Sequence, residues 1–504
     1  MTAAEGDGGT TEPQAAVGAA SRPVEAPGRE LPWPTRRSAG GAAPPRPGPA
    51  ATGRPGPAAA DRSGPAAAGR SGPDAVGGEP PRPTRPEAAD GEPLWPHQRL
   101  DVAALRRRGI APVPFRQFVL KTHSRCNLAC TYCYIYQGAD DSWRRRPARV
   151  PDATVRRTAA RIGEHASAHR LRRIRVELHG GEPLMAGPEA VIAYADAVRA
   201  AVPEGCEVTA SVQTNGTLLT AGVLDRLAAA RIRVGLSLDG GTDRLNRRRT
   251  DHAGRPSWPA TARAARLLAA RGEQYYAGIL CTIDLAADPG EVYASLLALD
   301  PPGIDFLLPH ANWGSPPPGL RHHLQRTAPA RGSRPTPYGD WLARAFDLWW
   351  DAGRMRTRVR LFREIVALLL GAPSSAEAVG LSPMAAVVVD TDGAVEQVDS
   401  LKSAYPEAPS TGLDVFRHTF DDALCHPGIA ARQIGAEGLA ADCRACPVLR
   451  VCGGGNYAHR YAPRTGFLHP SVYCADLERL IRHAAARLGD VLHRTGPVAS
   501  TCHT

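Results

Sequence analysis

The stretch Cys126-Asn-Leu-Ala-Cys130-Thr-Tyr-Cys133 places three thiols within eight residues. Three thiolates so close together can hold three irons of a [4Fe–4S] cube, because soft sulfur ligands suit iron–sulfur clusters. No fourth cysteine lies nearby in the sequence, so the fourth iron would stay open to an outside ligand. Zinc is the alternative, although zinc ligands usually come as two separate C-x2-C pairs. A disulfide is not expected from three clustered thiols in a chain without a secretion signal.

The spacing of these cysteines resembles a known motif. The run fits CxxxCxΦC, in which Φ is an aromatic residue, and Tyr132 stands at that place. It therefore resembles the cluster motif of radical S-adenosylmethionine (SAM) enzymes, in which SAM occupies the open iron. The resemblance implies that Cys126, Cys130 and Cys133 hold a [4Fe–4S] cluster and that SAM is a cofactor.

Length and composition favour a cytoplasmic enzyme with more than one domain. The chain has 504 residues, which is enough for two or more domains. No apolar run is long enough to span a bilayer and the first residues are no signal peptide, so we expect no membrane partner. The net charge of +11 is almost all arginine, because Lys121 and Lys402 are the only lysines. No nucleic-acid motif accompanies this charge, so no nucleic-acid partner is expected.

From residue 115 onward, short apolar strands alternate with amphipathic helices. Such β-α repeats predict an α/β fold with a parallel sheet and right-handed crossovers, and six repeats make a partial (β/α)6 barrel of the TIM type. The chemistry of this fold gathers at the carboxyl ends of the strands. The expected strands are Phe115–Thr122, Ile174–His179, Glu207–Gln213, Ile232–Leu238, Tyr276–Ile283 and Ile304–Leu308, and the expected helices include Asp152–His169, Pro188–Ala201, Ala221–Ala230 and Pro259–Ala270.

The second strand ends in a glycine-rich turn, His179-Gly-Gly-Glu-Pro183. Gly180 and Gly181 would let backbone approach a ligand closely, and Glu182 would offer a carboxylate to an ammonium group. A plain strand-to-helix turn is the alternative. After a CxxxCxΦC loop, the turn resembles the GGE motif that holds the amino group of SAM.

Polar residues also follow the third and fourth strands. Asn215, Ser237 and Asp239 carry groups that suit ribose hydroxyls, and Arg249 could pair with a carboxylate. Local turn chemistry is the alternative, since Asn-Gly and Asp-Gly form turns whatever the function. The sixth strand ends near His310 and Trp313, which would contact substrate or pack as a lid. The SAM contacts implied by the resemblance are Tyr132, Gly180, Gly181, Glu182, Asn215, Ser237 and Arg249.

A second set of cysteines lies near the carboxyl end, at Cys443, Cys446, Cys452 and Cys474. Four thiolates close the coordination shell of a cube, so a cluster here would have no open iron. Tetrahedral zinc is the alternative. The glycines after Cys452 would let the backbone wrap a bulky cube, which favours an auxiliary [4Fe–4S] cluster.

Residues from about 95 to 485 resemble the radical SAM/SPASM peptide maturases, and three stretches resemble the FxsB type. These stretches are Pro114-Phe-Arg-Gln-Phe-Val-Leu-Lys-Thr-His-Ser-Arg-Cys126, Gly303-Ile-Asp-Phe-Leu-Leu-Pro-His310 and Cys452-Gly-Gly-Gly-Asn-Tyr-Ala-His-Arg460. The expected boundaries are 1–95 for a disordered Pro/Ala/Gly/Arg-rich tail, 96–325 for the barrel, 326–380 for a helical linker, 381–485 for a SPASM-like domain, and 486–504 for a carboxyl-terminal tail.

The sequence departs from the usual two auxiliary clusters of SPASM domains. Asn456 stands where the CGGGC pattern has its last cysteine, and Val398 stands where an upstream pattern has another. One auxiliary cluster is therefore expected. Asp399 matches a residue that acts as a base in some relatives. Its alternative is an exposed residue on the expected hairpin Val387–Asp399, which turns at Asp392-Gly393.

The resemblance implies a ribosomally synthesised precursor peptide as substrate and an electron donor such as ferredoxin or flavodoxin. Reductive cleavage of SAM would give a radical that removes a Cβ hydrogen, and the peptide would close a three-residue cyclophane between an aromatic ring carbon and Cβ. A base such as Asp399 would take the released proton, and the auxiliary cluster could accept the electron. The alternatives are a thioether bridge, epimerisation, sulfatase-maturase-like oxidation, or a non-catalytic iron–sulfur protein that binds peptides or senses redox state.

Overall fold

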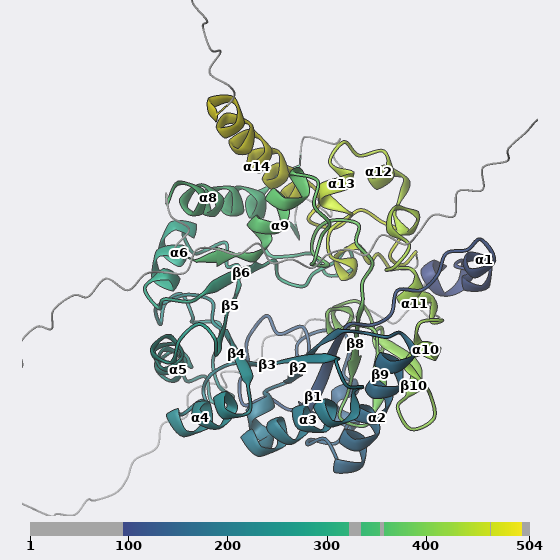
Figure 1. Ribbon diagram of the computed structural model, residues 1–504. Helices are drawn as coiled ribbons and strands as arrows, with labels where there is room; N and C mark the ends of the chain where they lie inside the picture. The colour runs from purple at the N-terminus through teal and green to yellow at the C-terminus, as the bar shows by residue number, and fades with distance from the viewer. Residues whose placement is uncertain (1–93, 322–333, 353–356, 464, 496–504) are drawn as a thin grey trace, which may run out of the picture. The chain divides into compact units, whose positions relative to one another are not determined.

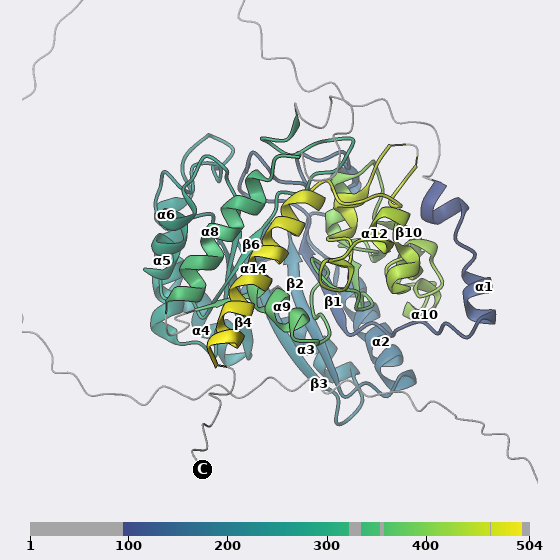
Figure 2. The ribbon, with the colours of Figure 1, turned by 90° about the horizontal axis from the view of Figure 1, so that it is seen from above.

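The computed structural model describes residues 94–321, 334–352, 357–463 and 465–495, which all lie in one compact unit (Figures 1 and 2). The expected tail, residues 1–95, lies outside the described residues except for its last two. Of these, Trp95 is buried and packs in a small apolar cluster with Val398 and Tyr457. The boundary at 95 therefore falls one or two residues too late, because a large aromatic side chain already joins the core. None of the described helices is both long and apolar enough to cross a bilayer.

A ten-stranded sheet organises this unit, in the order β10-β9-β8-β1-β2-β3-β4-β5-β6-β7. The strands from β8 through β1 to β7 run parallel, whereas β8, β9 and β10 pair antiparallel. All six strands expected for the barrel form, with ends displaced by at most two residues. Their bounds are β1 Gln117–His123, β2 Arg173–Gly180, β3 Glu207–Thr214, β4 Ile232–Ser237, β5 Tyr276–Thr282 and β6 Gly303–Leu307, and those of the others are β7 Arg358–Val359, β8 Ala386–Val389, β9 Ala394–Glu396 and β10 Ser410–Asp414.

Helices follow the barrel strands and cover the outer side of the curved sheet (Figure 1). The four helices expected between the strands are confirmed, within one residue at each end. These four are α2 Asp152–Ala168, α3 Pro188–Ala201, α4 Ala221–Ala229 and α5 Trp258–Arg271, and the other longer helices are α6 Pro289–Leu297, α8 Pro337–Asp351, α9 Arg360–Leu369 and α14 Cys474–Thr495. The short helical elements are Leu94–Gln98 (η1), Val102–Arg107 (α1), Ser142–Arg145 (η2), Pro183–Ala186 (η3), Asp399–Ser403 (η4), Phe420–Ala423 (α10), Pro427–Ala430 (α11), Gly435–Gly438 (η5), Ala441–Arg444 (α12), Leu449–Cys452 (α13) and Tyr457–Arg460 (η6).

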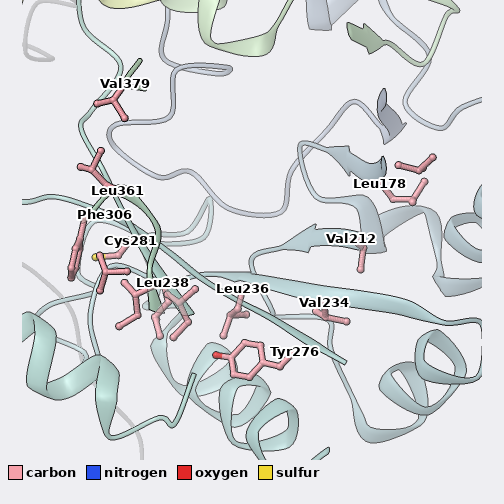
Figure 3. Close-up of a cluster of buried hydrophobic side chains, with 14 of the residues drawn as sticks. Leu178, Val212, Val234, Leu236, Leu238, Tyr276, Cys281, Phe306, Leu361 and Val379 are labelled. Atoms are coloured by element: carbon pink, nitrogen blue, oxygen red, sulfur yellow. The ribbon is translucent and has the colours of Figure 1, made fainter. Parts of the chain in front are cut away.

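The main core lies around the barrel strands. In β2, Ile174, Val176 and Leu178 are buried while the residues between them are more exposed, which is the period of two that marks a strand. Figure 3 shows part of this core, in which Leu178 and Val212 come from neighbouring strands and Cys281 is buried as a small apolar side chain. This core fixes the strand ends that carry the polar residues.

The hairpin expected at residues 387–399 forms as β8 and β9, and Gly393 at its turn has a φ of +91°. The hairpin does not stand apart from the barrel, because β8 pairs in parallel with β1 from Gln117 to Leu120. Asp399 does not lie exposed on the hairpin. It begins η4 and is 8% exposed, since the chain turns inward after β9.

The expected helical linker, residues 326–380, contributes to the barrel. Its described part forms α8 and α9 and adds the short strand β7 beside β6. The expected tail boundary at 486 falls inside α14, which packs along α8 and continues to Thr495. Arg487 explains this continuation, because it forms ion pairs with Asp347 and Asp351 of α8. The remaining residues of the expected tail, 496–504, lie outside the described part.

Candidate functional site

The three cysteines of the first motif lie in the loop that follows β1, at the carboxyl ends of the barrel strands. Cys126, Cys130 and Cys133 are close enough to raise each other's pKa by charge repulsion. Burial is the larger cause and raises the pKa of Cys126 to about 12. A thiol in this setting stays protonated unless a metal holds it as a thiolate, so the three residues fit a metal cluster.

Polar N–H groups also approach the first thiol. The backbone amide of Leu128 donates to Cys126 Sγ at 3.4 Å, and Asn215 Nδ2 donates to the same sulfur at 3.8 Å. Hydrogen bonds to cluster sulfurs are one way in which proteins set the potential of an iron–sulfur centre. Asn215, from the end of β3, is therefore beside the cysteine loop as expected, but its amide contacts sulfur.

The two glycines after β2 allow a close approach of protein backbone. A Cβ on Gly180 would lie 2.2 Å from the His123 carbonyl oxygen, and a Cβ on Gly181 would lie 2.5 Å from the Arg125 carbonyl oxygen. The Gly181 amide donates to the His123 carbonyl at 2.9 Å. The absence of side chains at Gly180 and Gly181 thus lets the backbone at His123 and Arg125 pack directly against the turn. The sequence analysis expected a ligand in this space.

Glu182 is buried and serves as a junction between β2 and β3. Its carboxylate accepts hydrogen bonds from Thr214 Oγ1 at 2.7 Å and from the Asn215 amide at 2.8 Å. It also accepts one from the Leu184 amide at 3.0 Å. Burial raises the pKa of Glu182 against the effect of these donors. The side chain therefore positions Asn215, and contact with a SAM ammonium remains a proposal.

Tyr132, Asp239 and Arg249 form a buried triad at the site. Tyr132 Oη donates to Asp239 Oδ2, and Arg249 Nη1 donates to Tyr132 Oη at 2.7 Å. Arg249 Nη1 also lies 3.8 Å from Asp239 Oδ1. Arg249 Nε is buried and has no hydrogen-bond partner, so this guanidinium keeps a donor for a further acceptor. The aromatic residue of the cysteine motif is thus bonded to the two charged residues expected at the rim of the barrel.

Ser237 lies at the end of β4 and accepts a hydrogen bond from Gln213 Nε2 at 2.8 Å. This contact joins the ends of β3 and β4. The expected contact of Ser237 with SAM stays a prediction.

A large cavity opens beside the cysteine loop, with a volume of about 1960 Å³. Its wall combines Tyr132 and Cys133 of the loop with His310 after β6 and Tyr405 and Tyr461 of the carboxyl-terminal part. The cavity is therefore lined by residues of the barrel and of the carboxyl-terminal part, and several of them carry aromatic rings.

The two residues expected near the open side of the barrel have different settings. His310 lines the cavity, meets the ring of Tyr134 edge to face with centroids 4.5 Å apart, and lies with Nδ1 3.2 Å from His459 Nε2. Trp313 donates from Nε1 to the Pro470 carbonyl at 2.8 Å and is outside the cavity wall. His310 is thus placed to contact a substrate, whereas Trp313 packs against the carboxyl-terminal part.

The four carboxyl-terminal cysteines surround one small pocket. Cys443, Cys446, Cys452 and Cys474 all line it, together with Gly454. Burial raises the pKa of Cys452 to about 12, and neighbouring thiols add to the rise. Four thiols around one pocket, of which Cys443 and Cys452 are buried and the other two are partly exposed, fit a closed [4Fe–4S] cluster, and they also fit tetrahedral zinc.

The loop that follows Cys452 depends on glycine and on Arg460. Gly453, Gly454 and Gly455 all have positive φ, and a Cβ on Gly453 would lie 1.7 Å from the Gly380 carbonyl oxygen. Buried Arg460 donates to the carbonyl oxygens of all three glycines at 2.7 to 3.1 Å. This guanidinium therefore holds the backbone around the second cysteine set.

Residues 120–293 match the family described as the Radical SAM superfamily. They form a radical SAM domain. Enzymes of this family use a [4Fe–4S] cluster together with SAM, which are the cofactors expected from the cysteine motif. The match identifies the superfamily and does not distinguish its subfamilies, so the FxsB type expected from the sequence stays a proposal.

Some curated proteins are similar to this chain over a region longer than residues 120–293. The cysteine-type anaerobic sulfatase-maturating enzyme of Clostridium perfringens (strain 13 / Type A) is 23% identical over 382 residues, which cover 75% of this chain and 98% of that protein. The serine-type enzyme of Klebsiella aerogenes is 31% identical over 215 residues, which cover 41% of this chain and 51% of that protein. With this domain and these relatives, the chain is an enzyme.

Solved structures confirm the fold of the radical SAM enzyme. Native anSMEcpe with bound AdoMet gives a TM-score of 0.61 at 22% identity and covers 75% of this chain and 99% of that chain. The structure with bound AdoMet and Cp18Cys peptide also gives 0.61, at 21% identity, with the same shares covered. Three quarters of this chain therefore share the fold of these solved structures.

Asp399, the expected base of this radical SAM enzyme, lies behind the cavity wall. Its Oδ2 accepts a hydrogen bond from buried Lys121, while its Oδ1 is buried without a hydrogen-bond partner. Burial alone would raise the pKa of Asp399, but the Lys121 ammonium lowers it to about 2. Asp399 also raises the pKa of Tyr134, a ring on the cavity wall, although burial is the larger cause. The carboxylate is therefore ionised, oriented by Lys121 and one side chain away from the cavity.

A buried charge cluster, formed by Asp140, Arg146, Asp390, Glu396 and Lys402, lies next to the same wall. Lys402 Nζ is 3.3 Å from Glu396 Oε2, 3.5 Å from Asp140 Oδ2 and 3.8 Å from Asp390 Oδ2. Arg146 pairs with Glu396 at 2.6 Å and with Asp390 at 2.9 Å. Both lysines of the chain are thus buried among carboxylates, whereas the surface basic residues are arginines.

The pKa of Glu396 in this cluster is raised to about 7, because burial and the nearby Asp390 outweigh Lys402 and Arg146. Its ordinary value is 4.5, so its contribution to stability is full below that pH and declines as the pH rises toward 7. Glu396→Gln lacks this titration. We expect its unfolding midpoint, relative to the wild type, to rise between pH 4.5 and 7 in anaerobic thermal scans. Glu407→Gln, an exposed control, should show no such trend, and parallel pH curves for Glu396→Gln and wild type would contradict the assignment.

Sequence reasoning missed the residues that support the site from behind. Lys402 belongs to the buried charge cluster. Arg460 holds the backbone of Gly453 to Gly455, and His459 lies beside His310. A signal existed for the first of these, because two lysines among so many arginines are unusual. Arg460 and His459 carried no separate signal, since their contacts depend on the tertiary fold.

Proposed function

We propose that this radical SAM enzyme modifies a ribosomally synthesised precursor peptide by removing a Cβ hydrogen and closing an intrapeptide C–C cross-link. The product proposed is a three-residue cyclophane between an aromatic ring carbon and Cβ. The cavity of about 1960 Å³ is the observation that carries the proposal. It has Tyr132 and Cys133 of the cysteine loop in its wall and is larger than a small metabolite needs. The solved relative with bound AdoMet and Cp18Cys peptide supports a peptide occupant.

The residues that would hold the cofactors are the two cysteine sets. Cys126, Cys130 and Cys133 would bind the first [4Fe–4S] cluster, and Cys443, Cys446, Cys452 and Cys474 would bind an auxiliary one. When bound with SAM, the first cluster supplies the electron for reductive cleavage to a 5′-deoxyadenosyl radical. The electron itself would come from a donor such as ferredoxin or flavodoxin.

The residues around the cysteine loop would orient SAM. The unpartnered Nε of Arg249 is available to the SAM carboxylate, and Tyr132 and Asp239 hold this guanidinium in place. Glu182 fixes the ends of β2 and β3 and would receive the SAM ammonium. Gly180, Gly181, Asn215 and Ser237 complete the proposed SAM contacts.

The cavity wall would position the peptide and keep water away from the radical. Tyr134, His310 and Tyr405 present rings on which an aromatic side chain of the peptide can pack. A hydrogen atom would leave Cβ with the deoxyadenosyl group, and the carbon radical would add to the peptide's aromatic ring. The ring then has to lose one proton and one electron, and an auxiliary cluster at the second cysteine set would accept the electron, so that the peptide loses two hydrogens in all.

Asp399 is the proposed acceptor of that proton. Its ionised carboxylate has one oxygen held by Lys121 and one oxygen without a partner. A carboxylate with a low pKa is a weak base, but the proton leaves an adduct that regains aromaticity, so a weak base suffices. Tyr134 lines the cavity and is close enough to Asp399 for the carboxylate to raise its pKa, so we propose that its hydroxyl carries the proton between them.

A sulfatase-maturase-like oxidation is the second candidate, and the similarity to the Clostridium perfringens and Klebsiella aerogenes enzymes favours it. It would oxidise a serine or cysteine side chain to an aldehyde. Oxidation of cysteine changes the peptide mass by more than two hydrogens, and oxidation of serine gives a carbonyl that reacts with hydrazides. A cyclophane does neither, so mass and hydrazide labelling separate the two.

The test uses anaerobically reconstituted full-length enzyme, SAM, a strong reductant and the short peptide encoded beside its gene. We expect a two-hydrogen mass loss, release of 5′-deoxyadenosine, and loss of one Cβ deuterium from labelled peptide. Fragmentation should locate a bond between an aromatic residue and a Cβ. A thioether would instead react with a sulfur-specific reagent, unchanged mass with deuterium exchange would indicate epimerisation, and absence of 5′-deoxyadenosine would overturn catalysis.

Asp399→Asn separates proton acceptance from radical formation. We expect peptide product to fall about 100-fold, a typical loss for a general base, while 5′-deoxyadenosine still forms. Asp392→Asn is the matched control, because this residue lies on the same hairpin at the exposed turn. Equal product from both variants would exclude Asp399 as the base.

A further inference from the structure

His165 of α2, His169 at the carboxyl-terminal cap of α2 and Asp421 of α10 converge on the outer side of the barrel. His165 lies in the last turn of α2 and His169 follows as its cap four residues later, so the two side chains lie on the same side of the helix end. His165 Nδ1 and His169 Nε2 each lie 2.8 Å from the same atom, Asp421 Oδ1. All three ligand-type atoms lie within 4.8 Å of one another. None of the three residues lines the large cavity.

The hydrogen bonding of His165 is incomplete in either neutral tautomer. Its side chain is 1% exposed, and Nε2 is buried without a hydrogen-bond partner. If the proton is on Nδ1, the bond to Asp421 is made and Nε2 is a buried lone pair. If the proton is on Nε2, two lone pairs face each other at Nδ1 and Asp421 Oδ1.

We propose that His165 Nδ1, His169 Nε2 and Asp421 Oδ1 bind a divalent zinc-type cation. A cation would accept the Nδ1 lone pair and leave the proton on Nε2, the nitrogen that does not bind the metal. Two imidazoles and one carboxylate form a common zinc donor set. The side chains of His169 and Asp421 are 26% and 49% exposed, so water can reach a fourth position. Tetrahedral binding needs ligand atoms roughly 3.3 Å apart, a small outward shift of Asp421.

The proposed site would fasten the carboxyl-terminal part to the barrel. Phe420, next to Asp421, packs against Phe118 with ring centroids 5.1 Å apart and against Phe115 at 6.2 Å. Phe118 belongs to β1, the strand that ends at the cysteine loop. A cation between α2 and α10 would therefore hold α10 and its aromatic contact on β1, and its role would be structural.

The test measures zinc binding to the full-length protein with both cysteine sets already loaded with iron and sulfide. After removal of adventitious zinc, we expect equilibrium dialysis to find one tightly bound zinc per wild-type chain and a higher unfolding midpoint with zinc. His169→Ala should weaken this binding at least tenfold and abolish the zinc-dependent rise. Cobalt should give weak visible bands typical of nitrogen and oxygen ligands, without the intense bands of thiolate ligands.

Two further variants separate zinc binding from a hydrogen-bond network. Asp421→Asn keeps an acceptor oxygen for both histidines but removes the ligand charge, so it should lose zinc while the zinc-free unfolding midpoint changes little. His418→Ala, a half-exposed histidine outside the site, should bind zinc as the wild type does. Wild-type protein that takes up no zinc, or His169→Ala and Asp421→Asn proteins that bind zinc unchanged, would overturn the proposal.

Discussion

Cys126→Ala should reduce 5′-deoxyadenosine formation to the level seen without enzyme. Two remaining thiolates cannot hold a cube whose fourth iron must stay open for SAM, so the loss should be complete. Total iron should fall from about eight to about four per chain, because the second cysteine set remains loaded. Iron analysis, electron paramagnetic resonance of the reduced protein and chromatography of the nucleoside products measure these outcomes.

Cys425→Ala is the matched control for this substitution. Cys425 is exposed and belongs to neither cysteine set, so its removal should leave iron content and nucleoside formation unchanged. Residual 5′-deoxyadenosine with Cys126→Ala would contradict the assignment of the first cluster. Loss of all iron would show that the two cysteine sets depend on each other for loading.

Lys402→Met should destabilise the folded protein by about 3–5 kcal/mol at pH 8, the usual effect of breaking a buried ion pair by removing one partner. Lys402 is 1% exposed and lies among Asp140, Asp390 and Glu396. Without its ammonium, the three carboxylates would retain Arg146 as the cation of the buried charge cluster. Methionine keeps the length of the side chain, so the expected loss reflects charge and not a cavity.

The effect of Lys402→Met should depend on pH in a defined direction. Lys402 lowers the pKa of Glu396, so removal of the ammonium raises that pKa further and protonation of Glu396 relieves the repulsion as the pH falls. The difference from wild type should therefore be smaller at pH 5 than at pH 8, as measured by urea unfolding under anaerobic conditions. Arg145→Met, which removes an exposed ion pair with Glu407, should cost about 1 kcal/mol or less. A pH-independent deficit would indicate lost packing.

The barrel could be predicted from the sequence because its signals are local. Apolar strands end in turns such as 180–183, and the helices between them keep a regular period, so strand ends were placed within two residues. The attachment of β8 to β1 could not be predicted in this way, because it joins segments separated by more than 260 residues. The expected tail at 486 was wrong for a related reason, since ion pairs to α8 extend α14.

The sequence located the cysteines of the candidate site better than the contacts of its polar residues, for a physical reason. Cysteine spacing marks candidate metal ligands directly, and the structure gathers the cysteines of each expected set in space. The sequence places polar residues at the strand ends, but it does not say whether they contact a ligand or neighbouring protein atoms. Glu182 and Ser237 turned out to bond neighbouring strand ends, and Gly180 and Gly181 make room for protein backbone. The ion pair of Asp399 with Lys121 spans 278 residues of sequence and carried no local signal.

The pairing of β8 with β1 limits how chains of this kind can be recombined. Because β8 is hydrogen-bonded along the strand that leads into the first cysteine loop, the carboxyl-terminal cysteines do not belong to a detachable module. A chimera cut between barrel and extension would expose the edge of β1 and remove Asp399 from Lys121. A change of substrate should therefore require substitution of loops on an intact sheet. We expect related chains to differ in the residues of the cavity wall and not by exchange of whole domains.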